Sequence, residues 1–224
     1  MIHVHIHQSL SQILSGFKIG VVHYEDIVVS DSPQMLKGRL QFFQETIRVD
    51  LENKSLSDVT GISEWRQVFR QLKIDPGRYR PSHEALYRRI AKGQPLPLIN
   101  SAVDLNTFFS LEYAIPLGIY DQAHLNGDVT IRIGNETDHY EGVNGRDNQM
   151  ANKLVSADEL GAFGSPLVDS KRTIVTSATT SALQLFYLRP ATSIEESGKL
   201  LTAAAKMFTQ IHGGECSTTV ISED

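Results

Sequence analysis

Two aspartates, Asp121 and Asp169, are the candidate acid–base residues of this 224-residue sequence. Asp121 ends the short apolar run LGIYD, and Asp169 begins the cluster DSKRT, which also holds two hydroxyls and two cations. A carboxylate in a pocket can hold a proton or orient a water molecule for attack on a bound substrate. We therefore predict that Asp121 and Asp169 are the catalytic residues if the chain is an enzyme.

The other polar residues that could line a pocket occur in two stretches, residues 98–121 and 161–180. The first stretch places capping and turn residues among apolar ones, and the second follows DSKRT with IVTSATTS, which is rich in Thr and Ser. Asp104 has the alternative role of a structural cap, as is usual for an aspartate near a helix start. The predicted pocket residues from these stretches are Asn100, Asp104, Asn106, Ser170, Arg172, Thr173, Thr176 and Thr179.

A basic segment precedes the first of these stretches. Eight of the chain's 21 Lys and Arg residues lie between Arg66 and Lys92, where only Asp75 and Glu84 oppose them. Such a segment, with tyrosines interleaved, can hold a phosphate backbone. It can equally be a solvated helix face whose acidic partners come from elsewhere in the fold. The candidate RNA-binding residues are Arg78, Arg80, Arg88, Arg89 and Lys92.

Three weaker patterns favour structural roles. His3, His5 and His7 would share one face of a strand, but no carboxylate or cysteine follows at a spacing typical of a metal site. Cys216 lies near His212, yet a free cysteine usually behaves as a small hydrophobe. The glycines of ELGAFGSP do not follow a strand and open a helix, so they favour a turn over a nucleotide loop. We therefore expect no metal and no cofactor.

The composition narrows the class of protein. With 41% apolar residues the chain can bury a core, and no run of 18 apolar residues would span a membrane. The first residues lack the features of a secretory signal, and a single cysteine is typical of a reducing, cytoplasmic setting. The net charge of −5 argues against a general nucleic-acid binder, and we expect no recognition of DNA sequence.

The elements that must position these residues follow from hydrophobic periodicity. Extended structure is predicted near residues 3–7 and 17–29, and helices over 32–47, 58–74, 81–93, 98–115 and 194–211. Short β-branched or aromatic runs predict strands at 117–121, 128–133, 138–143, 153–158, 172–179, 182–188 and 216–221. Helices first and strands later predict an α+β fold, and no linker divides residues 1–224 into separate domains.

The stretch INSAVDLNTFFSLEYAIPLGIYD resembles the editing domain in the beta subunit of phenylalanyl-tRNA synthetase. In that family a helix with a Val-Asp-x-x-Asn pattern leads through a Pro-containing turn to a strand that ends in aromatic-Asp. The matching positions here are Val103, Asp104, Thr107 (beside Asn106), Pro116, Tyr120 and Asp121. ALYRRIAKG and GAFGSPLVDSKRTIVTSA resemble two further segments in the same order, so the resemblance covers residues 75–190. Residues 1–74 would be a strand–helix extension packed on that part, and the chain looks like a stand-alone version of the domain.

The resemblance implies a β-sandwich-like core flanked by helices. It also implies a role in translation quality control, in which the family's domain removes wrongly attached tyrosine from tRNA. That reaction is hydrolysis of an aminoacyl ester by a positioned water, which needs no covalent nucleophile because the ester is already activated. The implied partner is tRNA or aminoacyl-tRNA.

Two positions depart from the family pattern. Gly118 stands where the bacterial synthetase has a histidine, and Ser177, give or take a residue, stands where it has a glutamate. Both belong to the family's editing pocket, so enzymatic activity stays open. One hypothesis is an RNA- or aminoacyl-tRNA-binding domain that hydrolyses mischarged esters in trans. The alternatives are a non-catalytic module for a small metabolite or free amino acid, and a protein–protein interaction domain.

Overall fold

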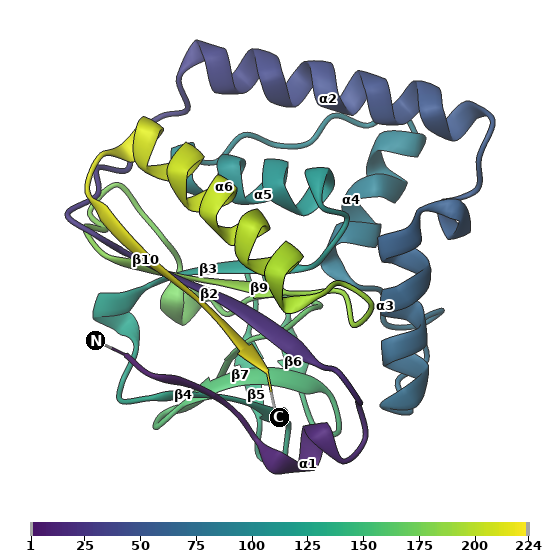
Figure 1. Ribbon diagram of the computed structural model, residues 1–224, viewed down its shortest axis with the longest axis vertical. Helices are drawn as coiled ribbons and strands as arrows, with labels where there is room; N and C mark the ends of the chain where they lie inside the picture. The colour runs from purple at the N-terminus through teal and green to yellow at the C-terminus, as the bar shows by residue number, and fades with distance from the viewer. Residues whose placement is uncertain (1, 223–224) are drawn as a thin grey trace.

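Two four-stranded sheets form the centre of the structure (Figure 1), a computed structural model that describes residues 2–222. The mixed sheet contains, in spatial order, β1 (Val4–Ile6), β4 (Val129–Ile133), β7 (Leu154–Asp158) and β8 (Gly161–Gly164). The antiparallel sheet contains, in spatial order, β10 (Glu215–Ser222), β2 (Lys18–Glu25), β9 (Ala182–Tyr187) and β3 (Leu117–Asp121). A small hairpin pairs β5 (His139–Glu141) with β6 (Asp147–Gln149).

The helices of residues 34–52, 82–91, 101–112 and 194–212 cover the antiparallel sheet on the side away from the mixed sheet, whereas the short helix at residues 8–11 lies against β4 of the mixed sheet (Figure 1). Helix α6 packs on β2 and β10, α5 packs on β3, and α2 lies outermost, over α4 and α5. The α-helices are α1 (Gln8–Ser11), α2 (Gln34–Glu52), α3 (Thr60–Gln71), α4 (Ser82–Ala91), α5 (Ser101–Glu112) and α6 (Ile194–His212). Three short 3-10 helices are η1 (Leu56–Asp58), η2 (Gln122–His124) and η3 (Lys171–Thr173).

Strand β9 is buried on both faces because layers lie on both sides of it. Its register with β3 pairs Gln184 with Ile119 and Leu183 with Tyr120, so alternate residues face opposite layers. Tyr187 reaches the mixed sheet, where its hydroxyl lies 2.8 Å from the hydroxyl of Ser156 on β7. These layers confirm the predicted α+β fold, with a sandwich-like pair of sheets flanked by helices.

Two predicted elements were wrong in type. Residues 172–179, predicted as a strand, form the end of η3 and a turn, and among residues 2–222 they pair with no strand of either sheet. The segment GAFG, predicted as a turn, is strand β8 and pairs with β7 through an irregular register. The β-branched residues at 172–179 therefore indicate extended backbone, but composition alone does not show whether a strand is available to pair with it.

Among residues 2–222, no helix combines the length and the apolar composition that crossing a membrane would require.

Candidate functional site

A cavity of about 460 Å³ lies at the open edge of β3, between α5 and the segment that contains η3. Strand β3 is the last strand of its sheet, so its outer edge faces this space instead of another strand. The walls are mostly apolar, with a few polar groups among them. The lining residues are Ile99, Val103, Asn106, Ile119, Tyr120, Val143, Asp169, Ser170, Lys171, Thr173, Ile174 and Val175.

Asn106 is held in one orientation by a buried hydrogen-bond chain. Tyr24 donates its hydroxyl to Oε1 of the fully buried Gln184 over 2.8 Å, which leaves Nε2 of Gln184 to donate to Oδ1 of Asn106, also over 2.8 Å. Because Oδ1 already accepts this bond, the side-chain donor of Asn106 is the group left for a ligand. Asn106 therefore offers two N–H groups at the wall of the cavity.

Asp169 is the acidic side chain of the cavity lining. Tyr120 donates its hydroxyl to Oδ1 of Asp169 over 2.7 Å, and no side chain of the described residues donates to Oδ2. Neighbouring protein atoms surround the carboxyl, and only part of its surface stays open toward the cavity. This burial raises the pKa of Asp169 to about 7, although the hydrogen bond from Tyr120 opposes the rise.

Two glycines make room for the tyrosine that holds Asp169. A Cβ placed on Gly118 would lie 1.9 Å from the Tyr120 hydroxyl, and one on Gly164 would lie 2.3 Å from it. Tyr120 leans along β3 over Gly118 and packs edge-on against Phe163 of β8. The Tyr120 ring therefore excludes a histidine, or any other side chain, at position 118 in this arrangement.

Backbone groups of β3 add polar contacts at the cavity. Tyr187 N–H donates to the carbonyl of Pro116, and Gln122 N–H donates to that of Ser181, which sets the alternation of the β3–β9 ladder. In that alternation the N–H and C=O of Ile119 point away from β9, toward the open edge.

The buried hydroxyl of Thr173, which also lines the cavity, has no hydrogen-bond partner within residues 2–222.

Two further predicted residues, Asn100 and Asp104, support the cavity without lining it. Asn100 caps α5 by accepting from Val103 N–H, and its amide donates to the carbonyl of Val175 over 3.1 Å, so it joins the two walls. Asp104 is buried and accepts from Ser32 and from the N–H of Ile99, which is the structural role named as its alternative.

The predicted catalytic residue Asp121 does not line the cavity. It is a buried cap of η2, accepting from Ala123 N–H and, over 2.6 Å, from the hydroxyl of Thr179. Thr176 and the exposed Ser177 lie in the turn that Thr179 closes.

Arg172 points away from the cavity, toward the mixed sheet. Its guanidinium forms two hydrogen bonds, of 2.9 and 2.8 Å, with the carboxylate of Asp158 on β7 and a third with the carbonyl of His124. The structure therefore brings Asn106, Asp169, Ser170 and Thr173 together at one cavity and places the other predicted pocket residues around it.

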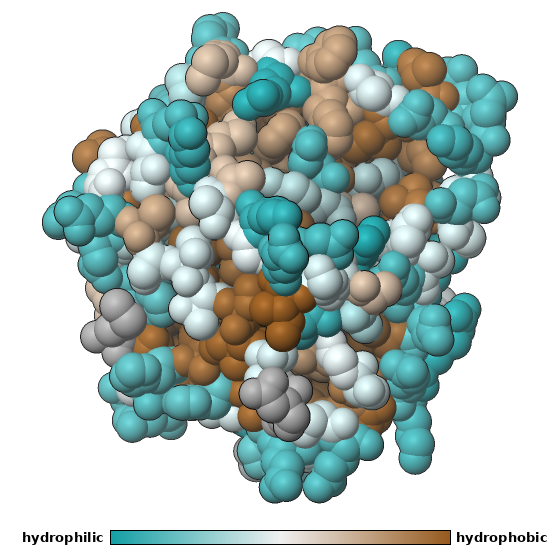
Figure 2. All heavy atoms as spheres, viewed as in Figure 1, coloured by the Kyte–Doolittle hydropathy of each residue, from teal (hydrophilic) through white to brown (hydrophobic). Residues whose placement is uncertain are grey.

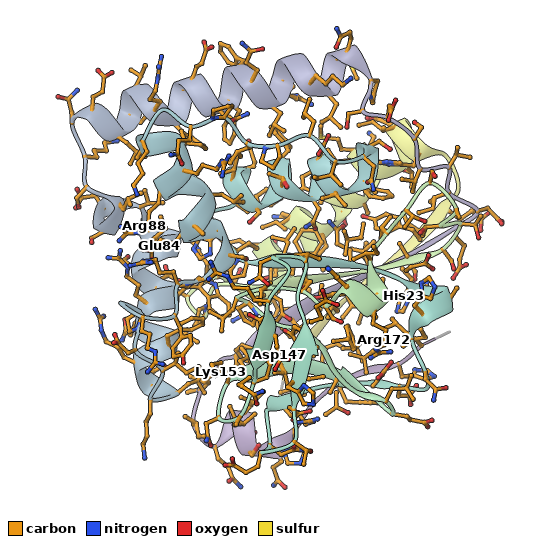
Figure 3. The ribbon with its side chains drawn as sticks, turned by 180° about the vertical axis from the view of Figure 1, so that it is seen from behind. His23, Glu84, Arg88, Asp147, Lys153 and Arg172 are labelled. Carbon is orange, nitrogen blue, oxygen red and sulfur yellow. The ribbon has the colours of Figure 1, made fainter. Side chains whose placement is uncertain are left out.

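The basic segment is partly neutralised by one buried acid. Glu84 of α4 accepts bonds from Arg66 of α3 at 2.9 and 2.8 Å and from Arg88 at 2.8 Å. Figure 3 shows Glu84 and Arg88 together on α4, on the opposite side of the molecule from Arg172. The candidate RNA-binding residues that stay exposed are Arg78, Arg80, Arg89 and Lys92.

Several lining residues were not predicted from the sequence. The helical spacing of Ile99, Val103 and Asn106 places them on adjoining faces of one helix, and that pattern was visible. Tyr120 and Lys171 stand directly beside predicted residues, but the contact between Tyr120 and Asp169 joins positions 49 residues apart. No spacing rule in one sequence identifies such a pair.

Comparison with known proteins identifies one matching family and several similar proteins. The model of the B3/4 domain family matches residues 64–210. An uncharacterized protein of Bacillus subtilis (strain 168), YhzB, is 35% identical over 205 residues, covering 89% of this chain and 90% of its own length.

Two similar proteins are beta subunits of phenylalanine–tRNA ligase. The one from Paramagnetospirillum magneticum (strain ATCC 700264 / AMB-1) is 25% identical, and the match covers 55% of this chain and 19% of the subunit. The one from Bartonella quintana (strain Toulouse) is 28% identical, covering 46% of this chain and 13% of the subunit. This chain thus spans less than a fifth of either ligase subunit.

Among solved structures, an N-terminal fragment of the phenylalanyl-tRNA synthetase beta subunit from Pyrococcus horikoshii aligns with a TM-score of 0.46 and 10% identity. That alignment covers 99% of this chain and 55% of the fragment. The family match covers well over half of the chain, and the Bacillus subtilis relative extends over nearly its whole length. The chain belongs to the B3/4 domain family.

Proposed function

We propose that the cavity beside β3 holds the aminoacyl end of a charged tRNA and that the protein hydrolyses mischarged esters in trans. The observation that carries this proposal is Asp169, a partly open carboxyl in the wall of an otherwise mostly apolar cavity. An apolar space of this kind suits an amino-acid side chain, and a few fixed polar groups would set its orientation. Family membership and the two ligase beta subunits among its relatives support the link to aminoacyl-tRNA.

The chemistry needs a water molecule and one proton acceptor. Asp169, once ionised, would accept a proton from water as the water oxygen attacks the ester carbonyl carbon. The bond from that carbon to the ribose oxygen then breaks, and the proton passes to the leaving oxygen. Asn106 amide hydrogens and the Ile119 N–H are donors at the same cavity that could stabilise the negative carbonyl oxygen in the transition state.

The RNA would be held by the exposed part of the basic segment. Arg78, Arg80, Arg89 and Lys92 are exposed, so they can contact phosphates without first breaking a buried ion pair. Arg88 differs from them because it is bonded to the buried Glu84. Its proposed role in RNA binding therefore comes with a role in holding α4.

A second candidate function is a non-catalytic module that binds a free amino acid or a similar amine. The observation that favours it is Oδ2 of Asp169, to which no side chain of the described residues donates, together with the lack of a histidine or a second carboxylate among the lining residues. An ammonium group beside Oδ2 would pair with the carboxylate and favour its ionised form. In this case Asp169 binds the ligand and does not activate water.

The test is deacylation of a panel of mischarged tRNAs by the purified protein. We expect hydrolysis of one or a few species, lost in Asp169→Asn, which keeps an acceptor for Tyr120 but cannot take up the proton. Asp147→Asn is the matched control, because Asp147 is exposed on β6 and does not line the cavity. Retained hydrolysis in Asp169→Asn would remove Asp169 from the mechanism.

The second candidate predicts a different pattern. No tRNA of the panel would be hydrolysed, and free amino acids would raise the melting temperature of the protein, since a ligand that binds only the folded state stabilises it. The N-acetylated amino acid, whose nitrogen is an uncharged amide, should not raise the melting temperature.

A further inference from the structure

Helix α2 carries an apolar stripe on its outer side, independent of the cavity. Met35, Phe42 and Val49 leave 71%, 71% and 55% of their surface exposed, although they are large hydrophobic residues. They are spaced seven residues apart, and a seven-residue step on an α-helix drifts only about 20°. The three side chains therefore form one line about 21 Å long, from a rise of about 1.5 Å per residue.

The stripe is separate from the face by which α2 packs on the protein. Leu36, Leu40 and Ile47 are the buried residues of α2, and they face α4 and α5. Figure 1 shows α2 as the outermost helix, and Figure 2 shows hydrophobic side chains among hydrophilic ones along the same upper edge. The described residues thus cover the inner side of α2 and leave the stripe open.

Gly38 lies within the stripe, between Met35 and Phe42. A Cβ added to Gly38 would meet no atom within 4 Å, so packing inside the protein does not require a glycine there. A glycine in the middle of a helix lowers its stability, because it loses more conformational freedom than alanine on folding. A second molecule that approaches closely at this point would explain the missing side chain.

The charges of α2 identify the kind of partner. Arg39 flanks the stripe in the first half of the helix, and Glu45, Asp50 and Glu52 flank it in the second half, whereas Lys37 and Arg48 lie on the opposite side of α2. Two copies of α2 that run antiparallel would place each basic half against the other's acidic half. A parallel pair would place like charges together. The stripe is thus complementary to itself in the antiparallel sense, as a two-fold symmetric interface requires.

We propose that the protein forms a two-fold symmetric homodimer through antiparallel packing of α2 against α2 of a second copy. Phe42 lies at the centre against its own copy, and Met35 packs against Val49 of the other chain. A groove of about 240 Å³ beside the stripe, between α2 and residues 93–95, gives the second copy further surface to contact. The cavity takes no part, and the groove meets the basic segment only at the apolar Ile90, so this inference does not rest on the proposed function.

Sedimentation over a range of protein concentrations tests the dimer. We expect a monomer–dimer equilibrium in the wild type, and a Kd at least about 30-fold higher in Phe42→Glu, as for loss of a central aromatic residue. Ile194→Glu is the control, because Ile194 is also an exposed apolar residue, but it lies at the start of α6. Unchanged circular dichroism and thermal melting of Phe42→Glu would establish that the variant is folded.

Cysteine cross-linking tests the direction of the helices. In a Cys216→Ser background, a mixture of Met35→Cys and Val49→Cys proteins should cross-link through a short bismaleimide, while each protein alone should not. Cross-linking of each protein with itself, with no additional product on mixing, would indicate parallel packing and overturn the proposal. A wild type that stays monomeric, or a Phe42→Glu variant that still dimerises, would overturn it as well.

Discussion

At the scale of single residues, Asp169 is an acid whose folded environment favours the protonated form. Burial raises its pKa to about 7, whereas an aspartate in an unfolded chain has a pKa of about 3.9. Holding the proton stabilises the folded state fully at low pH. That contribution is lost as the pH rises from about 4 through about 7, because the unfolded chain ionises more easily.

We therefore predict that Asp169→Asn gains stability relative to the wild type as the pH rises from 5 to 8. Asn keeps an acceptor for the Tyr120 hydroxyl and carries no charge, so it removes the pH-dependent term and leaves the contact. Urea unfolding of both proteins at several pH values measures the difference. Glu136→Gln, at an exposed loop position, should show a difference that does not vary in this way. A constant difference for Asp169→Asn would show that this carboxyl ionises as readily when folded as when unfolded.

At the scale of elements, the pairing of α3 with α4 depends on a buried carboxylate. Glu84 is fully buried in the first turn of α4 and takes hydrogen bonds from Arg66 of α3 and from Arg88 one turn on. Burial opposes ionisation of Glu84, but these two guanidinium groups outweigh it and keep the pKa of Glu84 below its usual value. The acid thus depends on the two cations more than they depend on it, because both arginines keep partial contact with water.

We predict that Glu84→Gln lowers the free energy of unfolding by about 3 kcal/mol, the low end of the range for removing one partner of a buried ion pair. The low end applies because Arg66 and Arg88 keep partial contact with water. Chemical denaturation measures the loss, and Glu112→Gln at the exposed end of α5 should change stability by less than about 0.5 kcal/mol. Equal stability of the two variants would mean that packing alone joins α3 to α4.

The elements differ in how far the sequence determines them. Helix α5 was predictable because Asn100 is a cap and the apolar spacing follows a helical period. Four of the five longer helices lie within three residues of their predicted bounds, and α2 extends five residues beyond its predicted end. Residues 172–179 were not predictable, because extended backbone becomes a strand only when it pairs, and here a cavity separates residues 173–175 from the open edge of β3.

The candidate site also has a part that the sequence predicts and a part that it does not. Asn106, Asp169, Ser170 and Thr173 were predicted from polar residues in two stretches, and the structure places them at one cavity. Asp121 was chosen on the same grounds, yet it caps η2. Adjacent strand residues face different neighbours, so Tyr120 reaches Asp169 while Asp121 reaches Thr179. Only the packing of the sheets determines which of the two meets the cavity.

At the scale of the whole molecule, charge is distributed unevenly. The chain has a net charge of −5, but the segment between Arg66 and Lys92 leaves six cations exposed after Glu84 has bound Arg66 and Arg88. An acidic protein with exposed cations gathered in one segment would bind RNA through that segment and repel it elsewhere. The RNA binding that we propose should therefore depend on few cations and show a moderate dependence on salt.

We predict that Arg80→Ala/Lys92→Ala reduces both the affinity for tRNA and its dependence on salt. Each phosphate contact that is lost should lower the slope of log K against log salt concentration by about 0.7–0.9. Lys54→Ala/Lys206→Ala is the matched control, since it removes two exposed cations outside the segment. Arg88→Ala is a poor probe, because it also leaves Glu84 short of a partner and would weaken α4. Fluorescence anisotropy at several salt concentrations gives the slopes. Equal slopes for the two double variants would show that Arg80 and Lys92 do not contact RNA phosphates.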